Sequence, residues 1–291
     1  MSGRTRSLPG VARRWRLRSP AAVVGVARAF LERSVLVALS YRTRFALGIG
    51  SLGLSVATFL FVGKAVALSG TGFVERYGIG YTEFALVGTI VHGAAVGGLG
   101  AFRAAVRREQ VQGTLETLAC APVPLPVSIA LSGLADSGVL GAGAGVAFAV
   151  VGWRAGLSPA EFGTALGAFV LYAAAMCGLG LASAGVVLVT KQGDPVSWIV
   201  AATTGLLGGV YFPIDLLPRW LSGAAGLLPT THALSVVRGA LGVASGAAPN
   251  AGAASSVRFL AVTAALSLSV GVLVLRWGER RALRFGTLAE Y

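Results

Sequence analysis

The residues of this chain that could do chemistry are few, because only 12% of its side chains are charged. The densest group lies in one polar stretch that holds three arginines and two glutamates and closes on three prolines: Arg103, Arg107, Arg108, Glu109, Glu116, Pro122, Pro124 and Pro126. Charges of both signs on helix-forming sequence suit docking to another protein surface. We therefore predict that Arg103–Pro126 is an ordered helical segment that contacts a partner.

Asp136 and His92 stand inside strongly apolar sequence. A carboxylate in such surroundings is costly and usually faces a helix-bundle interior or a cavity. Two roles are therefore open for Asp136. It either contacts substrate or a transported proton, or it is hydrogen-bonded and structural. His92 precedes Gly93 and Gly97, a pattern typical of tight packing with a hydrogen bond across helices. No partner ligands at metal-binding spacing accompany it, and neither His92 nor His232 has the neighbours of a catalytic triad.

The elements that must position these residues are membrane helices. The chain has 291 residues, of which 55% are hydrophobic, and its mean hydropathy is +0.77. Soluble domains carry about 25% charged residues, so this composition indicates a polytopic membrane protein. Backbone groups in lipid need internal partners, and the alternation of a barrel strand is absent, so the predicted fold class is all-α.

Six transmembrane helices are predicted between residues 45 and 275: Phe45–Gly63, Glu83–Phe102, Val127–Val151, Phe162–Thr190, Val196–Phe212 and Val257–Leu275. With the N-terminus inside, 18 of the 24 Lys and Arg residues fall on the cytoplasmic side. This bias predicts that both termini are cytoplasmic. The expected location is a bacterial-type plasma (inner) membrane. The bias also explains the net charge of +13 without a nucleic-acid partner.

Residues 1–20 are Arg-rich and are predicted to form a flexible basic arm, and residues 285–291 are predicted to form a cytoplasmic tail. The transmembrane domain is predicted between them, at residues 21–284. Within Ala21–Arg44, charges interrupt apolar residues at helical spacing. That pattern favours an amphipathic helix in the membrane interface. The alternative is a tilted first span that begins near Ser34. Glycine pairs four residues apart predict further close helix packing: Gly141 and Gly145, Gly163 and Gly167, and Gly205 and Gly209.

The region Pro213–Ala254 is the least regular part of the apolar sequence. Pro213, Pro218 and Pro229 divide it into apolar pieces that are each too short to span a membrane. On the outer side, such pieces predict helices that re-enter the membrane before the last span. Six residues here predict either an outer gate or a structural cap: Pro213, Asp215, Pro218, Pro229, His232 and Arg238.

Two motifs resemble the membrane subunits of the type-2 ABC exporters. The first reads Glu109…Gly113-Thr114-Leu115-Glu116-x-Leu118…Pro122 and resembles the coupling helix of that family. The second resembles the family's signature before the last span and reads Gly209-Val210-Tyr211-Phe212-Pro213…Leu217-Pro218-x-Trp220-Leu221…Leu228-Pro229-Thr230-Thr231…Arg238. The resemblance covers roughly Ala21–Arg284.

The resemblance implies a permease subunit of an ATP-driven exporter, paired with a second permease subunit as a homo- or heterodimer. Two copies of a separate ATP-binding subunit would dock beneath the pair and hold ATP and Mg, because this chain contains no G-x-x-x-x-G-K-[ST] motif. No cofactor is expected on this chain, and membrane lipids surround it. The residues implied in ATPase coupling are Arg107, Arg108, Glu109, Gly113, Thr114, Leu115, Glu116 and Leu118.

Other functions stay open beside this one. A secondary transporter or channel working without ATP would favour paired intramembrane charges and internal repeats. A membrane-embedded enzyme would favour clustered His, Asp or Glu residues. Drugs, lipids, polysaccharides and peptides are all substrates of similar subunits, and apolar helix faces do not distinguish among them.

Overall fold

The structure is a computed structural model that describes residues 20–40, 42–70, 72–78, 80–120, 123–154, 156–190, 194–242 and 252–285. The predicted basic arm up to residue 19 and the predicted tail from residue 286 lie outside the described residues. Division of the chain into arm, permease domain and tail stays a prediction.

Every regular element in the described ranges is a helix, which confirms the all-α fold class. The elements are α1 (Pro20–Ser40), α2 (Arg42–Leu68), α3 (Phe73–Tyr77), α4 (Tyr81–Val111), α5 (Leu115–Ala119), α6 (Leu125–Arg154), α7 (Pro159–Thr190), α8 (Pro195–Leu207), the 3-10 helix η1 (Ile214–Leu216), α9 (Arg219–Ala225), α10 (Pro229–Ala240) and α11 (Ala253–Phe285).

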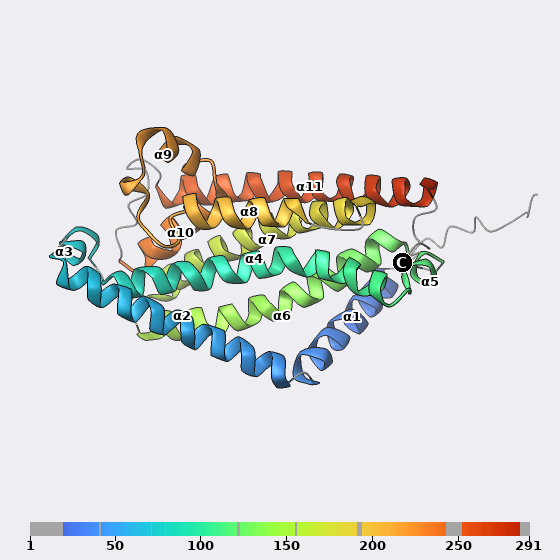
Figure 1. Ribbon diagram of the computed structural model, residues 1–291, viewed down its shortest axis with the longest axis horizontal. Coiled ribbons are helices and arrows are strands. Elements are labelled where there is room, and N and C mark those ends of the chain that lie inside the picture. The colour runs from blue at the N-terminus through green and yellow to red at the C-terminus, as the bar shows by residue number, and fades with distance from the viewer. Residues whose placement is uncertain are drawn as a thin grey trace, which may run out of the picture.

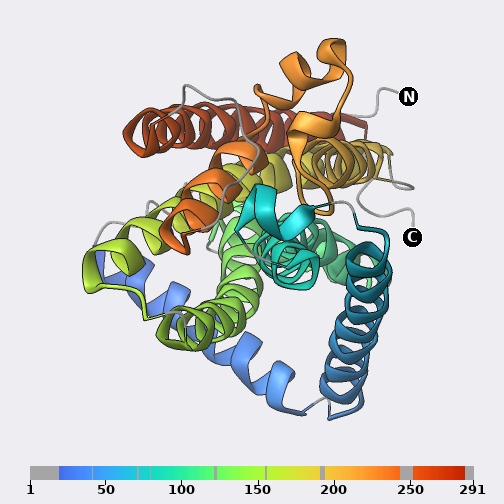
Figure 2. The ribbon, with the colours of Figure 1, turned by 90° about the vertical axis from the view of Figure 1, so that its left-hand side faces the viewer.

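The long helices lie side by side along the long axis of the molecule (Figure 1). Helices α3, α9 and α10 gather at one end, which we call the outer end, and α5 lies at the other, the inner end. Helix α4 lies near the centre of the end-on view, and α1 and α2 stand on the outside of the bundle (Figure 2). The first residues of α1 and the last residues of α11 share the inner end (Figure 1).

Four helices are long and apolar enough to cross a membrane: Tyr81–Val111, Leu125–Trp153, Pro159–Thr190 and Ala253–Arg284. They include the second, third, fourth and sixth predicted spans, which therefore have the length and composition of membrane helices. Two shorter apolar helical stretches overlap the other two predicted spans: Gly53–Leu68, within α2, and Pro195–Leu207, which is α8. That α2 and α8 also cross the membrane, which would give six spans, therefore stays a prediction.

The predicted fifth span, Val196–Phe212, is wrong at its outer limit, because α8 ends at Leu207. Its 13 residues extend over roughly 20 Å, which is shorter than a hydrocarbon core of about 30 Å. The chain turns at Gly208 and Gly209, where Gly209 adopts a left-handed φ of 72°. A Cβ on Gly208 would lie 2.8 Å from Thr230 Cβ, so glycine also allows α10 to approach this turn.

The predicted interfacial helix Ala21–Arg44 is also wrong at its end. Helix α1 stops at Ser40, and Arg42 and Arg44 belong to α2. Ser34 lies within α1, so no helix begins there. Helix α1 runs obliquely to the bundle and packs against α6 (Figure 1), and it leaves Val24, Leu31 and Leu36 exposed. Its place in the membrane interface stays a prediction.

Helices α7 and α11 pack more closely than the sequence led us to expect. A Cβ on Gly271 would overlap the carbonyl oxygen of Gly178, and a Cβ on Gly278 would overlap that of Gly185. The two contacts recur after seven residues on each helix, as expected for parallel helices in backbone contact. In contrast, a Cβ on four of the predicted packing residues would meet nothing within 4 Å: Gly141, Gly145, Gly163 and Gly167. Among the described residues, these glycines of α6 and α7 therefore make no close helix contact.

Two hydrophobic clusters fill the bundle. One includes Val91, Tyr172, Leu234 and Leu260 and joins α10 to the long helices. The second includes Phe102, Leu115, Ile129 and Leu188 and lies toward the inner end. Helices α4 and α7 contribute to both clusters, so they form the core on which the polar residues of the two ends are mounted.

Candidate functional site

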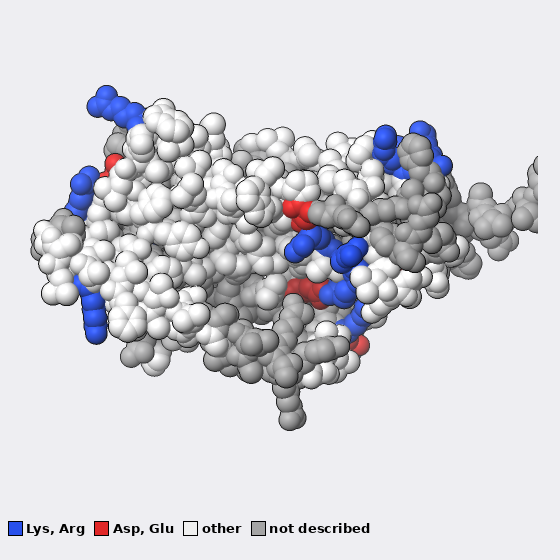
Figure 3. All heavy atoms as spheres, viewed as in Figure 1, with Lys and Arg blue, Asp and Glu red and all other residues white. Residues whose placement is uncertain are grey.

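On the face of the molecule shown in Figure 3, charged side chains lie toward the two ends, and most of the described surface between them carries none. This distribution is expected for a protein whose middle lies in lipid. Each end therefore presents its own group of candidate functional residues.

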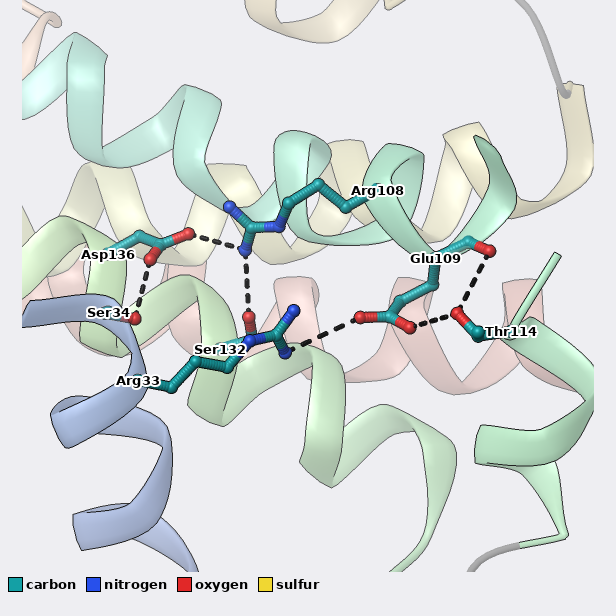
Figure 4. A network of polar contacts seen from close by, with 7 residues as sticks. All are labelled: Arg33, Ser34, Arg108, Glu109, Thr114, Ser132 and Asp136. Atoms are coloured by element: carbon teal, nitrogen blue, oxygen red, sulfur yellow. Dashed lines mark hydrogen bonds and ion pairs between the residues drawn. The ribbon is translucent and has the colours of Figure 1, made fainter. Parts of the chain in front are cut away.

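At the inner end, Asp136 of α6 joins three helices (Figure 4). Its Oδ2 accepts a hydrogen bond from Arg108 Nη2 of α4 at 2.6 Å, and its Oδ1 accepts one from Ser34 Oγ of α1 at 2.7 Å. Arg108 Nη2 also donates to Ser132 Oγ at 3.0 Å. These contacts fit the hydrogen-bonded structural role that was one of the two alternatives for Asp136. They arise because α4 continues past the expected span limit of Phe102 to Val111 and carries Arg108 to the carboxylate.

Glu109, the next residue on α4, contacts Arg33 and Thr114 beside the Asp136 contacts (Figure 4). Its Oε1 lies 3.7 Å from Arg33 Nη1 of α1, and its Oε2 accepts a hydrogen bond from Thr114 Oγ1 at 2.5 Å. Gly113 reverses the chain between them with a left-handed φ of 65°. The Thr114 hydroxyl donates back to Glu109, and the Thr114 backbone carbonyl accepts from Leu118 N at 2.9 Å.

The short helix α5 follows directly and confirms the predicted helical piece in this stretch. Leu115 is buried and belongs to the inner hydrophobic cluster, and the partly buried Leu118 packs against that cluster. Val111, at the end of α4, is 73% exposed, and Arg107 and Thr117 are also exposed. The side chain of Glu116 and residue Pro122 lie outside what the structure describes. The stretch therefore has an anchored side and an exposed side.

Asp194, the N-cap residue of α8, was not among the predicted site residues. Its Oδ1 accepts hydrogen bonds from Ser197 N at 3.0 Å and Ser183 Oγ at 2.8 Å, and its Oδ2 lies 3.2 Å from Arg103 Nε of α4. An Asp-Pro pair before an apolar segment is a local helix-start signal that predicts the cap. The pairing with Arg103 has no local signal, because 91 positions separate the two residues in the sequence.

These contacts link the movement of α4 to the movement of the helices around it. Arginines of α4 hold carboxylates of α6 and α8, and its Glu109 holds α1 and the segment before α5. A displacement of α5 or of the end of α4 would therefore be passed to α1, α6 and α8. The arrangement holds helices together, and nothing in it resembles a nucleophile with its base.

The Arg108–Asp136 pair is open to a direct test of its contribution to stability. We expect R108Q and D136N each to lower the free energy of unfolding by about 1–2 kcal/mol, a value reduced because the side chains are 34% and 22% exposed. The double variant should lose no more than the worse single variant, because the second substitution removes a group that has already lost its partner. Thermal unfolding of the purified protein in detergent measures all three. Additive losses would contradict the pairing.

At the outer end, Arg238 of α10 is 1% exposed. Its Nη1 donates to the carbonyl oxygen of Gly209 at 2.7 Å, and its Nη2 donates to those of Phe84 and Val210 at 3.0 and 3.1 Å. The guanidinium carbon lies 3.5 Å from the centre of the Phe84 ring. Arg238 therefore joins α10, the first turn of α4 and the turn after α8.

Asp215 of η1 forms a second outer contact. Its Oδ2 lies 2.7 Å from Arg76 Nη2, and the Tyr77 hydroxyl donates to both carboxylate oxygens at 2.9 Å. Burial and, after it, the hydrogen bond to Asp215 raise the pKa of Tyr77 to about 12, so the hydroxyl stays protonated and donates at neutral pH. The Arg76–Asp215 pair is exposed, with 61% and 29% of the two side chains accessible.

The remaining predicted outer residues have structural positions. Pro213 and Pro218 each precede a short helix, and Pro229 begins α10, where a missing N–H does no harm. His232 is placed by Gly226 O, 2.9 Å from its Nε2, and by Ser256 Oγ, 3.2 Å from its Nδ1. Because a carbonyl oxygen can only accept, Nε2 carries a proton and donates to Gly226 O.

His92 lies deeper in the bundle and is 7% exposed. Its Nδ1 is 3.1 Å from the Tyr172 hydroxyl, which lies 3.0 Å from Thr230 Oγ1. The structure thus contains the hydrogen bond across helices that the sequence predicted for His92, and the chain of contacts continues from α4 through α7 to α10.

Comparison with known families gives one match. The model of a family described as ABC-2 type transporter matches residues 26–241, which is more than half of the chain. A search of curated proteins found no match. The matched range contains the network at the inner end and the Arg238 and Asp215 contacts at the outer end.

Proposed function

Because the chain belongs to the ABC-2 type transporter family, we propose that it is an export permease driven by a separate ATP-binding subunit, which docks on the segment Glu109–Leu118. The chain is a multi-pass membrane component of an ABC transporter. ATP coupling, the direction of transport and the substrate, for which we retain a drug, lipid or polysaccharide, belong to the proposal. ATP and Mg²⁺ would be held by two copies of the partner, beneath a pair of permease subunits.

One observation carries the coupling role: the segment is firmly attached on one side and exposed on the other. Leu115 is 2% exposed inside the inner cluster, and Thr114 is bonded to Glu109, whereas Val111 is 73% exposed. A partner that pushes on the exposed side would move α4, and the carboxylate pairs would pass the movement to α1, α6 and α8. An exposed apolar side chain beside polar ones is also typical of the centre of a docking surface.

Val111→Asp tests this docking surface. The substitution places a charge where an apolar contact is proposed, and the exposed position leaves the fold intact. We expect the co-expressed ATP-binding subunit to be lost during purification, or its ATPase activity to lose its response to substrate. Glu116→Arg should have the same effect through charge reversal.

Leu68→Asp is the matched control, because Leu68 is an 88% exposed apolar residue at the end of α2, toward the outer end. It should retain the partner and the ATPase response. Normal coupling in both Val111→Asp and Glu116→Arg would refute the docking role of Glu109–Leu118.

The outer contacts support a role as a gate for transport. Opening the outer end would have to break the exposed Arg76–Asp215 pair, while the buried Arg238 contacts keep α10 attached to α4 and to the turn after α8. We propose that η1 and α3 form the part that moves and that α10 forms the part that stays.

The paired charges Arg108 and Asp136 also fit a secondary transporter that works without ATP. Transport into sealed vesicles distinguishes the two functions. Uptake that requires ATP and the partner supports the exporter, and uptake driven by an ion gradient in the absence of ATP supports the secondary transporter.

A further inference from the structure

Helix α11 carries an apolar stripe that the described part of this chain does not cover. Four of its exposed apolar side chains form this stripe: Val262, Leu266, Val270 and Leu273, with 58%, 60%, 52% and 65% of each accessible. Their spacings of three and four residues place them on one face of the helix. Within α11, only 17% of the most apolar 18-residue stretch is buried by the described chain. This face therefore suits contact with the hydrocarbon of the membrane.

The stripe ends in a group of aromatic and basic side chains near the inner end. Trp277 follows Leu273 by four residues and is 49% exposed. Arg280, Arg281 and Arg284 follow Trp277 by three, four and seven residues, so they continue on the same face. All three arginines are exposed, and together with Trp277 they line an open pocket. Figure 3 shows Lys and Arg side chains gathered over this end of α11.

The charge of this end is positive. Glu279 is the acidic residue of α11, and it lies between Arg276 and Arg280 in the sequence. The guanidinium carbon of Arg281 lies 5.7 Å from the centre of the Trp277 ring, close enough for a cation–π contact. Trp side chains favour the membrane–water interface. A guanidinium group can bind a phosphate through two parallel N–H···O hydrogen bonds.

We propose that Trp277, Arg280, Arg281 and Arg284 bind the phosphate of an anionic phospholipid whose acyl chains lie along Val262, Leu266, Val270 and Leu273. The cationic pocket and the apolar stripe form one continuous surface, which matches a molecule with a charged head and long apolar chains. A soluble phosphate compound would use the arginines and leave the stripe without an occupant. The site does not depend on ATP coupling, because it involves neither Glu109–Leu118 nor the carboxylate pairs.

The test uses the full-length protein purified in a zwitterionic detergent, with phosphatidylglycerol or phosphatidylcholine added and bound lipid counted by native mass spectrometry. The wild type should retain phosphatidylglycerol preferentially. The variant R280Q/R281Q/R284Q should bind phosphatidylglycerol on the order of 10- to 100-fold more weakly. Each basic residue near an anionic lipid strengthens its binding by a factor of roughly two to five, and the three factors multiply. The variant R280K/R281K/R284K, which keeps the charge and loses the planar donor pairs, should lie between the two.

The matched control is K64Q/R219Q/R258Q, which removes three exposed cations elsewhere in the chain. It should retain the lipid, and unchanged thermal unfolding of every variant shows that the fold is intact. Equal binding by the R280Q/R281Q/R284Q variant and the wild type would overturn the site. So would displacement of the lipid by millimolar inorganic phosphate, which would show a simple anion site. The lipid site would also be overturned if the R280Q/R281Q/R284Q variant lost the ATP-binding subunit and retained phosphatidylglycerol, because the arginines would then form a protein-docking surface.

Discussion

Arg238→Met is expected to lower the free energy of unfolding by about 3 kcal/mol or more. Methionine has a similar length, but it donates no hydrogen bond to the carbonyl oxygens of Phe84, Gly209 and Val210. These oxygens lie around a side chain that is 1% exposed, so water cannot easily replace the lost donors. Thermal unfolding in detergent, followed by tryptophan fluorescence, measures the loss.

Arg219→Met is the control for this substitution, because Arg219 is an exposed arginine of α9 at the same end of the molecule. It should unfold like the wild type. Arg238→Lys should be only partly stable, since one ammonium group cannot reach three carbonyls and also stack flat on the Phe84 ring. If Arg238→Met unfolded at the temperature of Arg219→Met, the three hydrogen bonds would contribute little to the outer end.

The parts of the fold that follow local rules were predictable from the sequence. Pro213, Pro218 and Pro229 divide the outer region into the pieces η1, α9 and α10, because proline is tolerated at or before a helix start and disrupts a helix interior. Gly208 and Gly209 end α8 by a similar local rule that the sequence analysis did not apply. The four long apolar helices follow from composition alone.

Helix limits were less predictable where hydropathy and helix formation diverge. The second span was predicted to end at Phe102, because charged residues begin at Arg103. The sequence that follows still consists mostly of helix formers, and α4 continues to Val111. Charge therefore marks where the apolar part ends, and it does not mark the end of the helix.

The partners of the polar residues could not be predicted, because they depend on tertiary packing. Asp136 was identified as unusual, but Arg108 and Ser34 lie 28 and 102 positions away in the sequence. The resemblance implied Glu109 in ATPase coupling, and its contacts with Arg33 and Thr114 within the chain, at 14% side-chain exposure, had no local signal. A local pattern shows that a residue needs a partner, and packing decides which one.

The close-packing glycines illustrate the same limit. The chain has 42 glycines, so spacings of four residues arise often and several carry no packing information. Gly178, Gly185, Gly271 and Gly278 can be recognised as a set only once α7 and α11 are known to be parallel neighbours. The common offset of 93 positions between Gly178 and Gly271 and between Gly185 and Gly278 is then a direct consequence of that packing.

Gly271→Val is expected to be the second most damaging change, with a loss of about 3 kcal/mol at the upper end of typical overpacking effects. The added Cβ overlaps the backbone oxygen of Gly178, and it would also lie 3.0 Å from Leu181 Cβ. A backbone atom cannot rotate out of the way as a side chain can, so α7 and α11 must separate along their length. The expected result is a lower unfolding temperature in detergent and a smaller folded fraction in the membrane.

Gly141→Val separates this clash from the general effect of replacing glycine by valine in a helix. Both positions are helical, and both variants lose the same backbone freedom, but a Cβ on Gly141 meets nothing within 4 Å. Gly141→Val should therefore unfold close to the wild type. Equal destabilisation by the two variants would mean that α7 and α11 can move apart freely, and the seven-residue glycine pattern would then have no role in holding the bundle together.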